Sequence, residues 1–213
     1  EGYEKAIRHS RAAIVEKHIE GRDYRVLVVG DRVAAVAERR PAQVVGDGQH
    51  TIRSLVEMEN GNPMRGEGHS KPLTRIELDE SVVHLLQEGG LTPLSVPNEG
   101  TIVVLRRNAN LSTGGTARAV QNIHPKNAEF AVRAAKALGL DVAGIDMCSK
   151  DIAVPLTENG GAILEANAGP GLRMHLSPSE GQPVDVAKDI VALLFPEHKP
   201  FTVPIVSVTG TNG

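Results

Sequence analysis

The stretches VAGIDM (residues 142–147) and AILEAN (residues 162–167) decide how this chain folds. Both are short runs dominated by apolar residues, and that pattern predicts two neighbouring β-strands. Because alternate side chains of a strand point to the same side, Glu165 and Asn167 share one face, and Asp146 can face them from the other strand. The two stretches therefore predict a β-sheet that gathers three oxygen-bearing side chains.

Asp146, Glu165 and Asn167 are the candidate metal ligands of the chain. Mg²⁺ prefers hard oxygen ligands and usually shares them with the phosphates of a substrate. The turn Ala-Gly-Pro-Gly at residues 168–171 follows directly, and its glycines allow the backbone to approach a phosphate or an acyl group. A surface aspartate beside a Glu-x-Asn turn is the alternative that spacing alone leaves open.

This pattern resembles the metal-binding end of the ATP-grasp ligases, in which Asp, Glu and Asn hold the magnesium ions that bridge the ATP phosphates. Residues 14–29, IVEKHIEGRDYRVLVV, are similar to the hinge of that family. The resemblance implies ATP and Mg²⁺ as cofactors, with the adenine beside the hinge and the ribose held by Asp23. Arg25 reaches the phosphates or forms only a salt bridge, and a plain charged hairpin is the alternative for the segment. The adenine-binding residues implied are Glu16, Lys17, His18 and Ile19.

The loop RRNANLSTGGTA at residues 106–117 resembles a loop of the glutathione-synthetase-like branch that lies near the γ-phosphate and the activated carboxylate. Paired glycines can expose backbone N–H groups to an oxyanion, and an arginine can neutralise a transferring phosphoryl group. Arg173 and His175 bind a substrate carboxylate or form a surface pair. The residues that the resemblance assigns to catalysis are Arg107, Asn110, Gly114, Gly115, Gly171 and Arg173.

The last ten residues, PIVSVTGTNG at 204–213, resemble the start of the phosphate-binding loop of Mur ligases. That loop would use Gly210, Thr211, Asn212 and Gly213, and the sequence stops before its lysine. The order of the two motifs is similar to a polymer-forming branch of ATP-grasp ligases in which a Mur-type module follows the ATP-grasp module. We therefore expect a C-terminal part of an ATP-grasp module at 1–199, with 49–99 inserted, and a truncated Mur-type domain at 200–213.

The resemblance implies an acid–amino-acid ligase that works through acyl phosphates. In the polymer-forming branch, aspartate extends a poly-aspartate backbone, and arginine is then joined to the β-carboxylates. The implied partners are ATP, aspartate, arginine and the growing polymer, in a homo-oligomer. As an internal fragment the chain itself would be inactive. A glutathione-synthetase-like ligase and a folded fragment without activity are the alternatives. Gly144 stands where D-alanine–D-alanine ligases have an arginine, which argues against dipeptide ligation of alanine.

Composition agrees with a cytoplasmic protein of mixed α/β class. The 213 residues, 40% hydrophobic and 23% charged, suffice for one sizeable core. A net charge of −3 gives no electrostatic case for nucleic acid, and no apolar run approaches the roughly 18 residues of a membrane helix. The single cysteine, Cys148, suits a reducing compartment and is interpreted as a small buried residue.

Local patterns predict an antiparallel sheet packed with helices, plus a helical insertion. Residues 24–29 and 32–38 read as a hairpin around Gly30-Asp31. Segment 60–75 is predicted to be a mobile loop, and residues 118–125 a second loop. Caps and apolar spacing predict helices at 3–13, 51–59, 79–87, 125–138 and 183–194.

Overall fold

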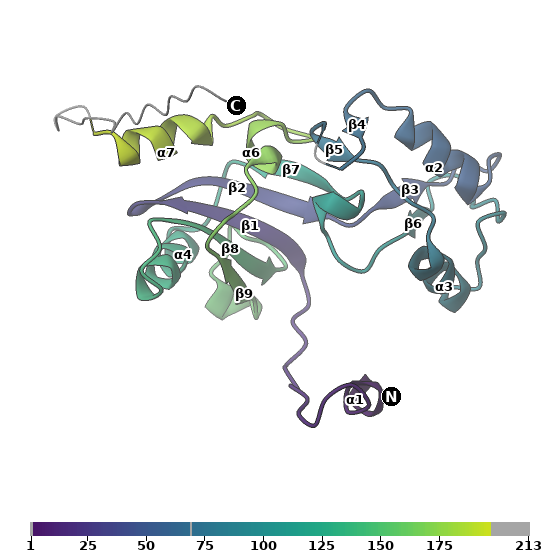
Figure 1. Ribbon diagram of the computed structural model, residues 1–213, viewed down its shortest axis with the longest axis horizontal. Coiled ribbons are helices and arrows are strands. Elements are labelled where there is room, and N and C mark those ends of the chain that lie inside the picture. The colour runs from purple at the N-terminus through teal and green to yellow at the C-terminus, as the bar shows by residue number, and fades with distance from the viewer. Residues whose placement is uncertain (1, 69, 197–213) are drawn as a thin grey trace, which may run out of the picture.

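The computed structural model describes residues 2–68 and 70–196. Its centre is a five-stranded antiparallel sheet with the strand order β7-β2-β1-β8-β9 (Figure 1). The sheet confirms the antiparallel α/β class that the sequence predicted. The strands are β1 (Arg22–Val29), β2 (Arg32–Arg40), β7 (Thr116–Val120), β8 (Val142–Ser149) and β9 (Ala162–Asn167).

The hairpin of β1 and β2 turns at Gly30, whose φ of 61° lies in the left-handed region that glycine adopts without strain. The pairing shifts by one residue along the hairpin, because Val28 faces Val33 whereas Leu27 faces Ala35. Ala34 is therefore the extra residue of a β-bulge. Beyond the bulge Asp23 lies opposite Arg39, which places both on the same face of the sheet.

Helices cover both faces of the sheet (Figure 1). On one face lies α4 (Pro125–Ala137), packed against Tyr24, Val26 and Ile145. On the other face lie α6 (Arg173–Leu176) and α7 (Val186–Leu194), and Val186 of α7 packs against Leu27. A one-turn helix, α5 (Leu156–Asn159), connects β8 to β9. Apolar side chains of alternate strand positions thus form two cores, one on each side of the sheet.

Residues 42–105 form a second apolar core beside the main sheet. Its strands β3 (Gln43–Val45) and β6 (Ile102–Val104) pair with each other, and α2 (Ile52–Asn60) and α3 (Glu80–Glu88) pack over them. Thr51 and Asp79 cap the two helices by accepting hydrogen bonds from backbone N–H groups. The division into an inserted element at 49–99 within 1–199 stays a prediction, as does the Mur-type segment, whose residues 200–213 lie outside the described part.

The structure differs from the sequence prediction in several segments. The N-terminal helix α1 is only Gly2–Ala6, not 3–13. The predicted loop at 60–75 contains a short parallel pair, β4 (Arg65–Gly66) and β5 (Leu73–Thr74), anchored by the buried Arg65. The predicted loop at 118–125 begins as the end of β7. The helix predicted at 125–138 ends at Ala137, and Leu138 beyond it is 60% exposed.

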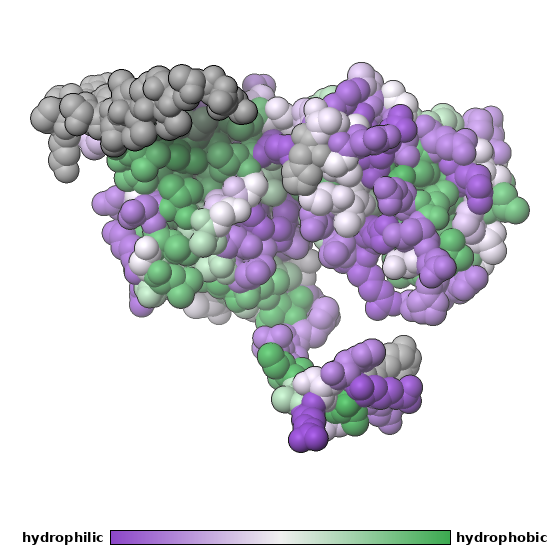
Figure 2. Space-filling model, in the orientation of Figure 1, coloured by the Kyte–Doolittle hydropathy of each residue, from purple (hydrophilic) through white to green (hydrophobic). Residues whose placement is uncertain are grey.

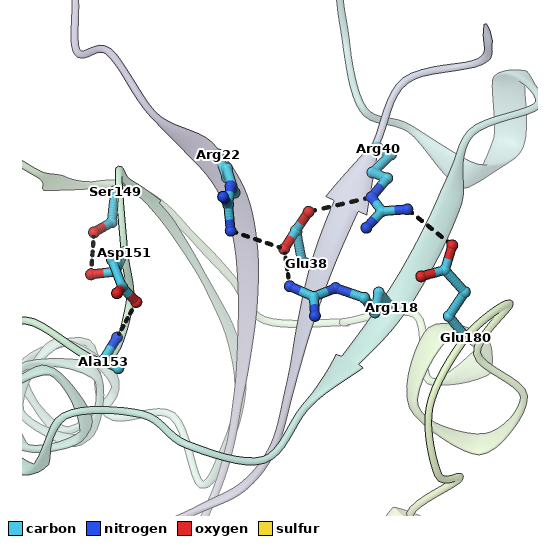
Figure 3. A network of polar contacts seen from close by, with 8 residues as sticks. All are labelled: Arg22, Glu38, Arg40, Arg118, Ser149, Asp151, Ala153 and Glu180. Atoms are coloured by element: carbon cyan, nitrogen blue, oxygen red, sulfur yellow. Dashed lines mark hydrogen bonds and ion pairs between the residues drawn. The ribbon is translucent and has the colours of Figure 1, made fainter. Parts of the chain in front are cut away.

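A group of arginines and glutamates, here called the edge cluster, ties β1, β2 and β7 together on the α4 face (Figure 3). Glu38 is buried and receives hydrogen bonds from Arg40 and Arg118, while Arg22 forms an ion pair with it at 3.7 Å. Arg40 also donates to Glu180 at 2.8 Å, in the loop after α6. The edge cluster consists of Arg22, Glu38, Arg40, Arg118 and Glu180.

Candidate nucleotide and metal site

A cavity of about 700 Å³, here called the principal cavity, opens on the α6 face of the sheet. It brings together side chains from four strands, from the loop around the short helix η1 (Leu111–Thr113) and from α6. The three predicted metal ligands meet here with Arg25, Asn110, Gly171 and Arg173, whereas Arg107, Gly114 and Gly115 do not line this cavity. The lining residues are Asp23, Arg25, Arg39, Asp146, Glu165, Asn167, Gly169 and the ranges 108–112 and 171–174.

Four charged residues, here called the cavity cluster, form one wall: Asp23, Arg25, Arg39 and Asp146. Arg39 donates Nη2 to Asp146 Oδ2 at 2.9 Å and both Nε and Nη2 to Asp23 Oδ1 at 3.0 and 2.6 Å. Arg25 donates Nε to Asp146 Oδ1 and Nη2 to Oδ2 at 3.2 Å. Two carboxylates and two guanidiniums therefore balance each other in formal charge.

The pKa of Asp23 is raised above its ordinary value. Burial of the carboxyl is the main cause, and the ion pair with Arg39 opposes it without cancelling it. The side chain of Asp23 is still 33% exposed, whereas that of Asp146 is 7% exposed. Asp23 is therefore the more solvent-exposed carboxylate of the cluster, and Asp146 is the buried one.

The predicted metal ligands lie next to each other on β8 and β9. Asp146 and Glu165 are direct cross-strand partners, and Asn167 pairs with Gly144. Asn167 donates Nδ2 to the carbonyl oxygen of Gly144 at 3.3 Å, which leaves its side-chain oxygen as an acceptor. Glu165 is exposed. Two carboxylates and an amide oxygen fit a hard cation such as Mg²⁺. Among residues 2–68 and 70–196, no group of three His, Cys, Asp or Glu side chains is placed to hold a metal ion.

Gly144 has a packing role beside the cluster. A Cβ atom there would meet Pro170 Cβ at 2.7 Å and Arg25 Cδ at 2.9 Å. The side chain of Arg25, which bonds to Asp146, packs directly over Gly144. The glycine that departs from the D-alanine–D-alanine ligase pattern is therefore required by the neighbouring arginine.

The glycine pair of the η1 loop does not present its N–H groups to the cavity. The Gly114 N–H is bonded to the Leu111 carbonyl at 3.3 Å, and the Gly115 N–H is bonded to the Asn110 carbonyl at 3.1 Å. Both glycines are buried. In this structure both donors are used inside the loop, and direct binding of an oxyanion by these glycines stays a prediction. Asn110 lines the principal cavity, so the loop contributes to it through that residue and its neighbours.

Arg107 lies outside the principal cavity and forms an ion pair with Glu88 of α3, with 74% of its side chain exposed. Arg107 does not line the principal cavity in this structure, and its role with a phosphoryl group stays a prediction. Arg107 instead borders a second cavity of about 430 Å³, here called the adjoining cavity. The two cavities share Asp23, Arg39 and residues 108–109.

The adjoining cavity has apolar walls from Pro41, Cys148 and Leu164 near the start of β1. Cys148 is buried as predicted, which raises the pKa of its thiol, and its Sγ lies 3.4 Å from the Ile19 carbonyl oxygen. Ile19 is thus the hinge residue that approaches the cavity. Glu16, Lys17 and His18 are exposed in a segment without helix or strand and line neither cavity.

Arg173 and His175 of α6 are not a surface pair. Arg173 lines the principal cavity and donates Nη1 to the Lys71 carbonyl oxygen at 2.9 Å, while Gly171 lies on the same wall. His175 is 2% exposed, and its Nε2 has no hydrogen-bond partner among the described residues. Burial, with Arg25 nearby, lowers the pKa of His175 to about 4, so the ring is neutral at pH 7.

Two site residues escaped the sequence analysis. Arg39 joins Asp23 to Asp146, and the sequence analysis placed it one residue beyond the predicted strand 32–38, whereas β2 continues to Arg40. Arg65 is 3% exposed and donates Nη1 to the carbonyl oxygens of Thr74 at 2.6 Å and Gly114 at 3.0 Å. It supports the η1 loop from the second core formed by residues 42–105. No sequence pattern indicated that contact.

A larger cavity of about 760 Å³ lies at the open edge of the sheet beside residues 32–35 of β2. Its lining is mostly apolar and includes Val33, Val120 and Val132. Figure 2 shows apolar residues gathered on this end of the molecule, between α4 and α7. It lacks the convergent oxygen and guanidinium groups of the principal cavity, so we place the candidate site in the smaller one. No helix in the described ranges is long and apolar enough to cross a membrane.

Comparisons with known proteins show which proteins this chain is similar to. Residues 99–194 match the family described as the RimK-like ATP-grasp domain. The cyanophycin synthetase of Trichormus variabilis is 52% identical over 212 residues, which cover 99% of this chain and 24% of that protein. The glutathione biosynthesis bifunctional protein GshAB of Pasteurella multocida is 38% identical over 197 residues, which cover 91% of this chain and 26% of that protein.

A crystal structure of a bifunctional glutathione synthetase from Pasteurella multocida has a TM-score of 0.71 with 38% identity. It is matched over 85% of this chain and 25% of that chain. The chain therefore spans about a quarter of the length of the curated relatives it matches. These matches confirm the resemblance that the metal, hinge and loop motifs predicted.

Proposed function

The chain carries the ATP-grasp fold, and because it does we propose that it binds ATP and Mg²⁺ as part of an ATP-dependent carboxylate–amine ligase. The observation that supports this most is the principal cavity, where Asp146, Glu165 and Asn167 line the same wall as Arg25 and Arg39. Oxygen ligands and guanidiniums in one cavity suit a triphosphate with its metal ion. The similarity to cyanophycin synthetases and GshAB proteins supports the same class.

In this proposal the nucleotide extends across both cavities. The apolar walls of the adjoining cavity, from Pro41, Cys148 and Leu164, suit the base, and the Ile19 carbonyl lies beside them. Asp23 stands where the cavities join and would accept hydrogen bonds from the ribose hydroxyls. The phosphates would then reach the principal cavity and its two arginines.

Asp146, Glu165 and Asn167 would hold the metal. A bound Mg²⁺ would neutralise charge on the phosphates, as it does in phosphoryl-transfer enzymes generally. Arg25 and Arg39 would bind phosphate oxygens, and their planar guanidiniums are suited to two-point contacts. The chain's own contribution is therefore charge and position, with no protein nucleophile.

The ligation proposed has two chemical steps. The γ-phosphoryl group passes from ATP to a substrate carboxylate oxygen, which gives an acyl phosphate and ADP. An amine nitrogen then attacks the acyl carbon, phosphate leaves, and the nitrogen gives up its proton to solvent. Arg173 and Gly171, on the α6 wall of the principal cavity, would face the carboxylate substrate.

We assign the substrates from the similarity to cyanophycin synthetases. Aspartate would join the end of a poly-aspartate chain in this site, and arginine would join the β-carboxylates at a Mur-type site. The predicted Mur-type residues Gly210, Thr211, Asn212 and Gly213 lie outside the described residues. The GshAB relatives make a glutathione-type ligase the second candidate.

The test has two levels. Calorimetric titration of the chain with ADP and Mg²⁺ is expected to show binding that Asp146→Asn weakens strongly, whereas Lys136→Gln, on the distant face of α4, leaves it unchanged. No binding to a folded chain would refute the nucleotide site. Ligation is then measured with the longest natural protein that contains the chain, because its relatives are about four times as long.

The ligation assay distinguishes the two substrate classes. Incorporation of labelled aspartate and arginine onto a β-aspartyl-arginine primer supports the cyanophycin assignment, with the aspartate step lost in Asp146→Asn. Joining of glycine to γ-glutamylcysteine instead would move the glutathione-type activity to first place. A protein that binds nucleotide but makes neither product would contradict both substrate assignments while keeping the site.

A further inference from the structure

Arg39 makes a bridge that the proposed function does not require. Its guanidinium donates to Asp146 Oδ2 at 2.9 Å and to Asp23 Oδ1 at 2.6 Å. In the proposed site, Asp146 serves the metal and Asp23 serves the ribose. One arginine therefore joins the carboxylates of the two ends of the nucleotide site.

This bridge competes with a metal ion at Asp146. Both oxygens of that carboxylate accept hydrogen bonds from guanidiniums, from Arg25 at Oδ1 and from Arg25 and Arg39 at Oδ2. A divalent cation at the same carboxylate would lie beside two positive groups in a site where Asp146 is 7% exposed. Like charges bound to the same carboxylate repel each other strongly when little water screens them. Metal binding to this arrangement is therefore opposed by the arginines.

Arg39 is the arginine that can leave. If it gives up Asp146 it still holds Asp23 through two hydrogen bonds, and Asp146 Oδ2 then keeps only the longer 3.2 Å contact to Arg25. Arg25 has no second carboxylate partner among the described residues, and the buried His175 near it is neutral at pH 7. Arg25 therefore stays with Asp146, while Arg39 has an alternative.

We infer that Arg39 is a positioning residue that occupies Asp146 until nucleotide phosphates draw it away, so that metal binding at Asp146 depends on nucleotide. The inference rests on the proposed nucleotide site. The phosphates bring negative charge into the principal cavity, and a guanidinium is a good partner for phosphate oxygens. Nucleotide and metal then increase each other's affinity reciprocally, because each favours the state in which Arg39 has left Asp146.

The experiment measures binding of Mn²⁺ alone, of ADP alone, and of Mn²⁺ with saturating ADP. Mn²⁺ accepts the same oxygen ligands as Mg²⁺ and is followed by its paramagnetic resonance signal. The variants are Arg39→Met, which removes the charge, and Arg39→Lys, which keeps a charge without the planar fork. Arg32→Met is the matched control, since Arg32 is an exposed arginine of the same strand that pairs with Asp189 outside both cavities.

In the wild type, ADP is expected to tighten Mn²⁺ binding about tenfold or more. Arg39→Met should bind Mn²⁺ alone about tenfold more tightly than the wild type, bind metal-free ADP more weakly, and lose most of the coupling. Arg39→Lys should keep the weak binding of Mn²⁺ alone, and Arg32→Met should behave as the wild type. Opposite shifts for the two ligands separate this role from a structural one, because a damaged fold weakens both.

The inference is overturned if Arg39→Met binds Mn²⁺ alone no more tightly than the wild type while it still binds ADP. Equal coupling in the wild type and in Arg39→Met would overturn it as well. If the folded wild type binds no ADP at all, the proposed nucleotide site fails first. That outcome is distinguishable from failure of the Arg39 role, which is seen only against measurable ADP binding.

Discussion

The cavity cluster and the edge cluster place arginines around carboxylates on opposite faces of the same strands. Register separates them, since Asp23 pairs with Arg39 and the next residue, Tyr24, pairs with Glu38. In the edge cluster three arginines surround the single buried carboxylate of Glu38 (Figure 3). In the cavity cluster two aspartates share two arginines and face open space. The same chemistry thus holds strands together in the edge cluster and lines the principal cavity in the cavity cluster, while Arg22, Glu38 and Arg40 also border the adjoining cavity.

The pKa shifts of Glu38 and Asp23 have opposite directions, and they give the difference between the two clusters a physical cause. Burial raises the pKa of Glu38, but hydrogen bonds from Arg118 and Arg40 outweigh it, and the pKa ends below its ordinary value. Burial raises the pKa of Asp23, and Arg39 does not offset it. The edge cluster therefore satisfies its carboxylate, whereas the cavity cluster leaves one carboxylate incompletely stabilised. Incomplete stabilisation of a charged group is typical of binding sites.

The largest expected effect is on function and comes from the cavity cluster. Asp146→Asn should lower metal affinity and ligation about a hundredfold, because the variant removes a charged oxygen ligand. Calorimetry with ADP and Mg²⁺ measures the first effect and the ligation assay measures the second. Circular dichroism must show that the variant is folded. Retention of wild-type metal-dependent binding would remove Asp146 from the site.

The second effect is on stability and comes from the edge cluster. Glu38→Gln should lower the free energy of unfolding by about 2–3 kcal/mol, because it leaves partly buried guanidiniums without their carboxylate. Chemical denaturation measures the loss. ADP binding, measured below the unfolding transition, should weaken far less than in Asp146→Asn, because Glu38 borders only the adjoining cavity and not the principal cavity that would hold the phosphates and the metal. A variant that keeps its stability but loses ADP binding would reverse the roles of the two clusters.

The sequence predicted the two strands that carry the candidate metal ligands because strand patterns depend on local alternation. Residues 142–147 and 162–167 read as apolar strands, and the period of two put Glu165 and Asn167 on one side. Helix α4 was predicted equally well, since a proline start and a glycine stop are local signals. The placement of Asp146 opposite Glu165 depends on the register between two strands, which local sequence patterns did not determine.

Arg39 could not be predicted because its face depends on a bulge. A regular hairpin that turns at Gly30 would place Arg39 opposite Arg22, on the α4 face. The extra residue at Ala34 shifts the pairing by one and turns Arg39 toward Asp23 and the cavity. The contact of Arg65 with Gly114 was hidden for a related reason, because it joins elements that are 49 residues apart. Both misses are tertiary choices that local patterns do not encode.

The third effect is the dependence of protein stability on pH, which we attribute to the buried His175 of α6. The pKa of His175, about 4 in the folded protein, lies below the ordinary value of 6.5, so the unfolded chain binds a proton more readily. Stability from this group is present above about pH 6.5 and is lost as the pH falls toward 4, by about 2 kcal/mol at pH 5. Denaturation midpoints between pH 7 and 5 should therefore fall more steeply in the wild type than in His175→Gln.

The exposed His84, which pairs only with Glu88 of its own helix among the described residues, provides the control for that measurement. His84→Gln should keep the steep wild-type slope. Equal slopes for the wild type and His175→Gln would mean that His175 titrates normally and that the α6 face is open to water. In that case Arg25 would lie beside a chargeable neighbour, and its fixed position in the cavity cluster would need another cause.

The smallest effect concerns the outermost link of the edge cluster. Glu180→Gln removes the ion pair with Arg40. The side chain of Glu180 is 56% exposed and that of Arg40 is 34% exposed, and exposed ion pairs contribute about 0.5 kcal/mol to the free energy of unfolding. The loop stays attached because the Glu180 carbonyl oxygen accepts the Ala119 N–H at 2.9 Å. The free energy of unfolding should change by no more than this, with ADP binding intact. A loss near that of Glu38→Gln would show that the edge cluster is stabilised as one network rather than through its buried centre.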